Sequence, residues 1–263
     1  MMNAVPNAPQ NWPPWEEDMV AIRVEVRREM EGLITEDETP VDNILSEKQQ
    51  RLLTEPLYGA WTGPAEYAPS HRPFLALANV GLFYALREPP LVPDVMLALD
   101  VVGLGADLSE KANRSYFTWE QGKPPLVAIE IVSNREGSED QEKLYKYAAA
   151  AVGYYVIFDP WCQLSDRVLR IYQLAGQAYV EKVGSQFKEV GLGVTLWQGK
   201  YEGEHQQWLR WVDQTGQLIP TSAERAENAE QRTENAEQRA ENAEQRAERL
   251  AAQLRKLGID PVV

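Results

Sequence analysis

The chain has 263 residues, of which 44% are hydrophobic and 25% are charged, and its formal net charge is −14. This composition is typical of a globular protein and excludes a disordered or fibrous one. The negative balance also excludes nucleic-acid binding through diffuse positive charge, because neutralising phosphates requires basic surface. No apolar run reaches the roughly 18 residues of a membrane span, and the acidic start lacks signal-peptide features, so we expect a cytoplasmic protein without membrane contact.

Cysteine and histidine are scarce. Cys162 is the only cysteine, and His71 and His205 are the only histidines, so disulfide scaffolds and cysteine-rich zinc sites are excluded. Carboxylates are abundant, with 40 Asp plus Glu against 26 Lys plus Arg. If the protein acts on phosphates, a divalent cation held by carboxylates must supply the positive charge.

Residues 1–45 are predicted to form an N-terminal arm, a helix and an acidic linker. Residues 16–31 carry Met19, Ile22, Val26 and Met30 at helical spacing. Residues 31–40 are acidic and contain a proline, which predicts a loop. This segment lies outside the expected core.

Residues 46–220 show a mixed pattern that predicts one α/β domain. In chain order we expect a helix at 72–87, strands at 91–102 and 125–133, a helix at 137–151 with Ser138 as its N-cap, a strand at 153–159, and short strands within 167–174, 178–183 and 193–197. The strand, helix and strand between Leu126 and Asp159 form a βαβ-like unit. The pattern therefore predicts a mixed β-sheet flanked by helices.

Residues 221–263 form a different kind of segment. Residues 226–246 read AENAEQR, TENAEQR, AENAEQR. Small or apolar residues alternate at spacings of three and four, which is the a/d seam of a coiled coil, at Ala226, Ala229, Thr233, Ala236, Ala240, Ala243, Ala247, Leu250, Leu254 and Leu257. We expect a helix over 222–257, either single or paired with a second copy to give a homo-oligomer.

Two carboxylates and a lysine meet at one edge of the expected sheet. Asp94 begins a strand, and Glu130 lies inside the apolar strand VAIEIVS. A carboxylate in such a strand must be paired, protonated or metal-bound, because burial of an unpaired charge is costly. Lys143 and Lys146 lie on the next helix and could reach back over the strand. Oxygen ligands with a nearby lysine suit a Mg²⁺ site.

These residues carry a resemblance. The segments LVPDVMLALDV at 91–101 and PPLVAIEIVSNREGSEDQEKLYKYAAAAVGYYVIFDP at 124–160 resemble the Uma-two-type restriction endonucleases, a branch of the PD-(D/E)XK nuclease superfamily. In that family a PD dipeptide precedes an E-V-x-S strand, an acid four residues before a lysine, a tyrosine, and a strand ending in Asp-Pro. The matching positions here are Asp94, Glu130 to Ser133, Glu139 with Lys143, Tyr147, and Asp159-Pro160. The resemblance covers about residues 46–200 and implies a restriction-endonuclease-like fold with the coiled-coil-like helix attached at its C-terminus.

The resemblance also implies a site. Asp94 and Glu130, with the Ile131 carbonyl, would hold Mg²⁺ or Mn²⁺, and Lys143 would position the attacking water. The lysine that the superfamily places two residues after the strand acid is Val132 here, so Lys143 on the helix takes its place. Glu139 would support the lysine or a second metal. Glu47 is an additional acid matched by loose position.

Each residue also has a purely structural interpretation. Asp94 could be a turn residue, and Glu130 could pair with an arginine. Glu139 and Lys143 have the i, i+4 spacing of a helix-surface salt bridge. Tyr147, Tyr154 and Tyr155 are expected in the core, and His71 as a cap or surface group. Trp208 and Trp211 are predicted to pack on the sheet rather than stack on bases.

Three functions fit this sequence. The first is a Mg²⁺-dependent endonuclease that hydrolyses phosphodiester bonds, with DNA as substrate, by metal-activated water. The second is an inactive nuclease-fold protein that acts as a partner-binding or assembly module through its tail. The third is a metal-dependent hydrolase of a smaller phosphate ester. The acidity and Val132 favour the second; the retention of Asp94, Glu130 and Lys143 favours the first.

Overall fold

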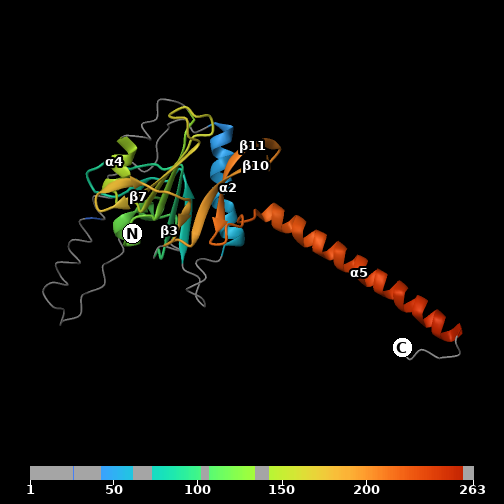
Figure 1. The fold of residues 1–263 in the computed structure, drawn as a ribbon. Helices are drawn as coiled ribbons and strands as arrows, with labels where there is room; N and C mark the ends of the chain where they lie inside the picture. Colours follow the sequence, from blue (N-terminus) through green and yellow to red (C-terminus); the bar gives the residue numbers. More distant parts are fainter. Residues whose placement is uncertain (1–25, 27–42, 62–72, 102–106, 134–141, 257–263) are drawn as a thin grey trace, which may run out of the picture.

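The computed structural model describes residues 26, 43–61, 73–101, 107–133 and 142–256. The mixed α/β architecture predicted from the sequence is confirmed (Figure 1). The elements in chain order are α2 (Ile44–Ala60), β1 (Phe74–Ala78), β2 (Leu82–Phe83), β3 (Val95–Leu99), the 3₁₀ turn η2 (Lys111–Asn113), β4 (Tyr116–Phe117), α3 (Thr118–Gln121), β5 (Val127–Ile131), α4 (Glu142–Ala149), β6 (Tyr154–Phe158), β7 (Leu169–Ala175), β8 (Ala178–Glu181), β9 (Gln186–Phe187), β10 (Leu192–Tyr201), β11 (Glu204–Asp213) and α5 (Ser222–Lys256). None of the described helices is both long and apolar enough to cross a membrane.

The central sheet has six strands in the order β1-β3-β5-β6-β7-β8. Only β5 and β6 are parallel; each other neighbouring pair in this sheet is antiparallel. Parallel neighbours require a crossover connection, and α4 lies in the chain between these two strands. The βαβ-like unit predicted between Leu126 and Asp159 is therefore confirmed.

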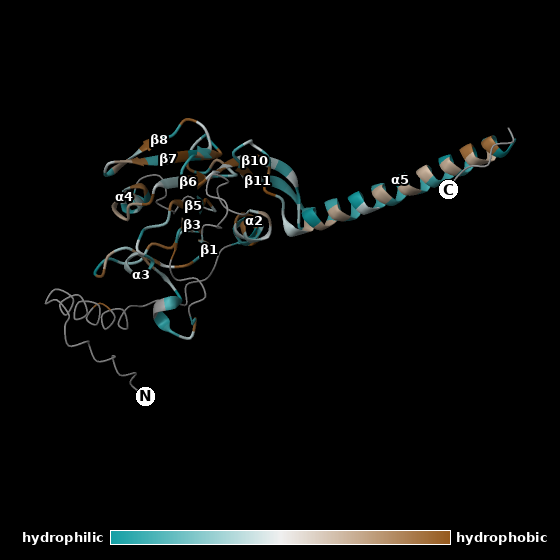
Figure 2. Cartoon of the chain, turned by 90° about the horizontal axis from the view of Figure 1, so that it is seen from below, coloured by the Kyte–Doolittle hydropathy of each residue, from teal (hydrophilic) through white to brown (hydrophobic). Residues whose placement is uncertain are grey.

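The sheet is covered on both faces. Successive residues of a strand point to opposite faces, so Leu97, Ile129 and Val156 share a cluster with residues of α2 and the β10–β11 hairpin. Met96, Ala128 and Tyr155 share the other cluster with residues of α4. Figure 2 shows α2 and α4 on opposite sides of this sheet. Strands covered on both faces explain why β3, β5 and β6 are apolar at almost every position.

The helix predicted at residues 72–87 is wrong. Within that range, β1 pairs antiparallel with β3, and β2 pairs parallel with β4. Asn79 takes a left-handed backbone conformation with φ of 54° between the two strands. The leucines and alanines there have high helix propensity, but pairing with a buried strand outweighs that weak local preference.

The predicted helix at 16–31 and the loop at 31–40 lie outside the described residues, except for Val26. Val26 is in helical conformation and packs against the cluster of Phe83 and Phe117. The predicted N-cap Ser138, the acid Glu139 and His71 also lie outside the described residues. The strands expected within 167–174, 178–183 and 193–197 are confirmed as β7, β8 and β10.

Trp208 and Trp211 of β11 are buried, as predicted, and donate hydrogen bonds to the main-chain oxygens of Gly199 and Leu53. The tyrosines at 147, 154 and 155 are likewise buried in the two core clusters. These rings therefore hold the layers together. Their burial removes the two tryptophans from any base-stacking role.

The helix predicted in the tail is confirmed as α5, which projects away from the sheet (Figure 1). Its start is a capping box: the Thr221 hydroxyl accepts from the Glu224 amide, and Glu224 Oε2 accepts from the Thr221 amide at 2.8 Å. Glu224 also receives two hydrogen bonds of 2.7 Å from Arg210, whose side chain is 2% exposed. Side-chain contacts therefore bind the first turn of α5 to β11.

Candidate functional site

Glu130 points from β5 into the layer between the sheet and α4. It is 2% exposed, and both of its carboxylate oxygens have donors on α4. The Tyr147 hydroxyl donates to Oε1 at 2.5 Å, and the Lys143 ammonium lies 2.9 Å from Oε2. A charge buried in an apolar strand is therefore compensated by one phenol and one ammonium group, as burial requires.

Asp94 lies beside Glu130 at the edge of the sheet. β3 and β5 are antiparallel with Val95 opposite Ile129, so one step further the register sets Asp94 next to Glu130. Oδ2 of Asp94 accepts a hydrogen bond of 2.6 Å from the Ile131 amide. The structure thus brings together the two acids that the sequence singled out, because an antiparallel pairing places the start of β3 at the end of β5.

Gln50 of α2 is a residue of this site that the sequence did not reveal. Its amide nitrogen donates to Asp94 Oδ1 at 3.2 Å, and its amide oxygen accepts from Asn79 Nδ2 at 3.1 Å. The Asn79 main-chain amide in turn donates to the Asp94 carbonyl oxygen. Because Asn79 occupies the amide oxygen of Gln50, the amide nitrogen is directed at Asp94. The only signal in the sequence was a polar residue on the buried side of a helix.

Glu47, one turn before Gln50, does not reach this cluster. It pairs with Arg51 at 2.7 Å, and its side chain is 58% exposed. The helical periodicity explains the difference, since residues three apart lie on neighbouring parts of the same face but differ in depth. The acid predicted by loose position is thus a surface residue, and an amide takes the inward position.

Lys143 and Lys146 have different partners. Lys143 reaches the buried Glu130, whereas Lys146 pairs with Glu142 on the exposed surface of α4. Val132, at the position of the superfamily lysine, is fully buried among apolar side chains. The described geometry therefore places one ammonium group at the carboxylates, and that group comes from the helix. The structural alternative for Glu130 named an arginine as its partner; among the described residues, Lys143 forms an ion pair with it.

Tyr147 acts as a hydrogen-bond donor over the whole physiological pH range. Burial, followed by the negative charge of Glu130 and the hydrogen bond to it, raises the pKa of Tyr147 well above its ordinary value of 10.0. The phenol is 1% exposed and stacks on Tyr155 with 4.8 Å between ring centroids. It therefore fixes one oxygen of Glu130 in position.

The loop after β6 closes the edge of the sheet next to the site. Both carboxylate oxygens of Asp159 accept main-chain hydrogen bonds, from Gln163 and Leu164, at 2.8 Å. The Gln163 side chain donates to the carbonyl oxygen of Ser133, directly after β5. Asp159 is fully buried and shapes this turn, so the Asp-Pro pair has a structural explanation.

The donor atoms of the site suit a hard divalent cation. Asp94 and Glu130 supply carboxylate oxygens. The Ile131 carbonyl is a third oxygen, because Ile131 follows Glu130 in the chain and its own amide donates to Asp94. No group of three or more acidic, histidine or cysteine side chains within metal-binding reach occurs among the described residues. A pair of carboxylates completed by main-chain oxygen, water and substrate phosphate is nevertheless the usual environment of Mg²⁺, which keeps several waters. The residues therefore fit this ion.

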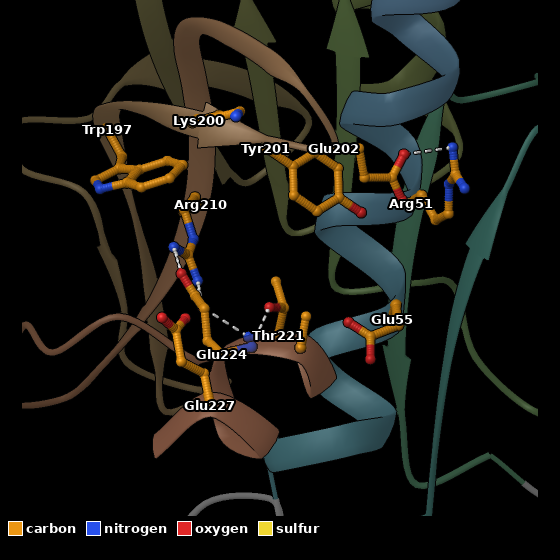
Figure 3. Close-up of a pocket in the computed structure, with 11 residues that line it drawn as sticks. Arg51, Glu55, Trp197, Lys200, Tyr201, Glu202, Arg210, Thr221, Glu224 and Glu227 are labelled. Carbon is orange, nitrogen blue, oxygen red and sulfur yellow. Dashed lines mark hydrogen bonds and ion pairs between the residues drawn. The ribbon is translucent and has the colours of Figure 1, made fainter. Parts of the chain in front are cut away.

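A cavity of about 410 Å³ lies elsewhere, between α2, the β10–β11 hairpin and the base of α5. Figure 3 shows Arg51 directed at Glu202 and Arg210 directed at Glu224 on its walls. The Arg210 guanidinium also lies over the Trp197 ring, 4.7 Å from its centroid. These cations already have anionic partners, and no predicted site residue lines the cavity. We therefore regard the cavity as part of the contact region between the start of α5 and the rest of the domain.

A protein-family model matches the part of the chain that contains the site residues. The model of the family Uma2, described as "Putative restriction endonuclease", matches residues 22–196. No curated protein and no solved structure matches the chain. The matched range contains Gln50, Asp94, Glu130, Lys143 and Tyr147, and it ends before α5.

Proposed function

Because the chain belongs to the Uma2 family of restriction endonucleases, we propose that it is a Mg²⁺-dependent endonuclease that hydrolyses phosphodiester bonds in DNA. The observation that carries this proposal is the convergence of Asp94, Glu130 and Lys143 at one edge of the sheet. Two carboxylates supply the negative charge that a metal requires, and the lysine supplies a donor for a phosphate oxygen or a water.

Each residue has a separate task in this proposal. Asp94 and Glu130, with the Ile131 carbonyl, would hold Mg²⁺ or Mn²⁺. Bound there, the ion supplies a Lewis acid that neutralises phosphate charge and lowers the pKa of water. Lys143 orients the attacking water in line with the scissile bond, and Tyr147 keeps Glu130 in the required rotamer. Gln50 and the Ile131 amide do the same for Asp94.

The acidity of the chain has a consequence for substrate binding. With a net charge of −14, the chain gains little from diffuse attraction to DNA. Binding must therefore depend on local contacts at the site, and a cation held by Asp94 and Glu130 would supply positive charge for the phosphate there. We expect weak binding to DNA without a divalent metal, and this separates the proposal from a generic DNA-binding protein.

The test is cleavage combined with metal binding. The full chain is incubated with supercoiled plasmid and Mg²⁺ or Mn²⁺, and metal affinity is measured by isothermal titration calorimetry. Asp94→Ala and Glu130→Ala should each abolish nicking and most metal binding. Glu142→Ala is the matched control, because that acid pairs with Lys146 on the exposed side of α4, and it should change neither. Unchanged metal binding in both site variants would refute the proposal.

We also propose that the heptads of α5 mediate self-association. The residues that support it are Leu250 and Leu254, which continue the seam of alanines; Leu250 is 52% exposed. Each leucine buries far more apolar area in a helix pair than an alanine does. In this proposal residues 46–220 carry the chemistry and residues 221–263 carry the assembly.

A further inference from the structure

We propose that α5 pairs with α5 of a second copy in parallel orientation, so that both nuclease-like domains lie at the same end of a two-stranded coiled coil. The inference rests on the self-association proposed above and adds its geometry. α5 has 35 residues, which corresponds to about 52 Å. Its surface beyond the first turn is almost entirely exposed, so a long face is available to a partner.

The first turn of α5 is held by its own domain. Ser222 donates to the Glu55 carboxylate, and Arg225 donates to the carbonyl oxygen of Gly59. Glu55 and Gly59 both lie on α2. Glu224 is bound by Arg210 of β11. These contacts fix the direction in which α5 leaves the domain. They also set the start of the free seam beyond Ala226, because Ser222 and Arg225 lie on the same side of the helix as the seam.

The charges of α5 do not suit a single helix. Arg232 and Arg239 have only Asn and Ala at the i±3 and i±4 positions, and in the described α5 neither forms an ion pair with its own helix. Glutamates instead face each other at i, i+4, as in Glu230 with Glu234 and Glu237 with Glu241. Like charges at this spacing destabilise an isolated helix. A single helix of this composition would be more stable if glutamate and arginine, rather than two glutamates, were spaced i, i+4.

The same charges suit a parallel pair. With Ala226 at position a, the e positions are Glu230, Glu237 and Glu244, and the g positions are Arg232, Arg239 and Arg246. In a parallel coiled coil the g residue of one helix meets the e residue of the next heptad on the other helix, and these contacts set partner choice and orientation. Arg232 would therefore meet Glu237 of the second copy, and Arg239 would meet Glu244. In an antiparallel pair, arginine meets arginine and glutamate meets glutamate.

The leucines select the register. A shift by one heptad keeps most arginine–glutamate contacts, because the three repeats are nearly identical. It would, however, place Leu250 opposite Ala243 and Leu254 opposite Ala247. Burying leucine against leucine excludes more apolar surface from water than burying it against alanine. Figure 2 shows the apolar residues of α5 gathered near its C-terminal end, where they align the two copies.

Disulfide trapping in the full chain tests the orientation. The exposed Cys162 is first replaced by serine, and then Ala229→Cys or Ala247→Cys is introduced singly. In the parallel pair each variant cross-links to itself under mild oxidation. In an antiparallel pair neither does so, but a mixture of the two cross-links. Gln238→Cys, at the outward f position, is the control and should stay uncross-linked. Only the first pattern supports the proposal.

Charge reversal tests whether the arginine–glutamate contacts stabilise the parallel pair. Glu237→Arg with Glu244→Arg should weaken self-association about tenfold or more in sedimentation equilibrium, since four arginine–glutamate contacts between the two helices become repulsive. The control Glu234→Arg with Glu241→Arg changes the same net charge at the outward b positions and should leave self-association unchanged. Equal effects of both pairs would overturn the proposal. A monomeric parent chain would overturn it as well, whereas absence of nuclease activity would bear only on the catalytic proposal.

Discussion

The ammonium of Lys143 lies 2.9 Å from Oε2 of Glu130, although the two residues are 13 positions apart in the chain. The contact forms because α4 follows β5 and packs over the same face of the sheet to which Glu130 points. A lysine on the strand two residues after Glu130 would share its face, and Val132 occupies that position inside the core. The helix thus provides the cation that the strand lacks.

The proposed role of Lys143 leads to a prediction for two neighbouring lysines. Lys143→Met should lower cleavage at least a hundredfold, because general acid–base and charge-stabilising groups contribute roughly 10²–10³ in rate. Lys146→Met should leave the rate within about twofold, because Lys146 pairs only with the exposed Glu142 among the described residues. Single-turnover cleavage of plasmid at saturating metal measures both. Equal rates in the two variants would contradict the role of Lys143.

Gln50 should support metal binding through Asp94. Gln50→Leu leaves Asp94 Oδ1 and the Asn79 amide without this partner, and we expect Mn²⁺ affinity to fall about tenfold. Gln49→Leu is a matched control, because Gln49 exchanges two hydrogen bonds with the Leu209 main chain and lies away from the acids. Both variants should lose about 1–3 kcal/mol of stability. If calorimetry shows the same metal affinity for both, Gln50 has only a structural role.

Tyr147 should contribute a stability that disappears in alkali. Its pKa is raised above 10.0, so the folded state favours the protonated phenol. That contribution is fully present below the unfolded value near pH 10 and is lost as the pH rises above it. Tyr147→Phe keeps the stacking on Tyr155 but removes the donor to Glu130, at a cost of about 1.5–3 kcal/mol at neutral pH.

Urea denaturation of the parent and the Tyr147→Phe variant at about pH 8 and about pH 11 measures this difference. The other buried tyrosines are present in both proteins, so only the gap between the two curves is attributed to Tyr147. The gap should narrow at the higher pH. A gap that is constant with pH would show that the pKa of Tyr147 is the same in the folded and unfolded states, and would contradict this prediction.

The effect of a C-terminal truncation on thermal stability should depend on where the chain is cut. Removal of residues 229–263 leaves the capping box and the Glu224–Arg210 pair in place, and the melting temperature should change little. Removal of residues 222–263 takes Glu224 away from the buried Arg210 guanidinium, and should cost about 1.5–3 kcal/mol. Differential scanning calorimetry distinguishes the two. Equal melting temperatures would show that the first turn of α5 adds nothing to the domain.

The strands that carry the site could be predicted from the sequence, while β1 and β2 could not. β3, β5 and β6 are continuous apolar runs bounded by turn residues, and the heptads of α5 repeat almost without change. Residues 74–83 read equally well as a helix, because alanine and leucine suit both structures in isolation. Their conformation is decided by β3, which offers them a partner strand.

The pair Asp94 and Glu130 also followed from residue types and spacing. Spacing left both Lys143 and Lys146 open, and the family resemblance favoured Lys143. The sequence alone therefore determined the local features of this protein. These are the apolar strands, the acid buried in one of them, and the C-terminal helix with its heptad pattern. The tertiary structure decided which groups surround the acids. Gln50 and Asn79 come from separate segments that share no periodicity with Asp94, and their hydrogen bonds exist only because α2 and the turn after β1 pack at the same edge of the sheet. Contacts between distant segments depend on how layers pack, and no pattern within a single segment records that.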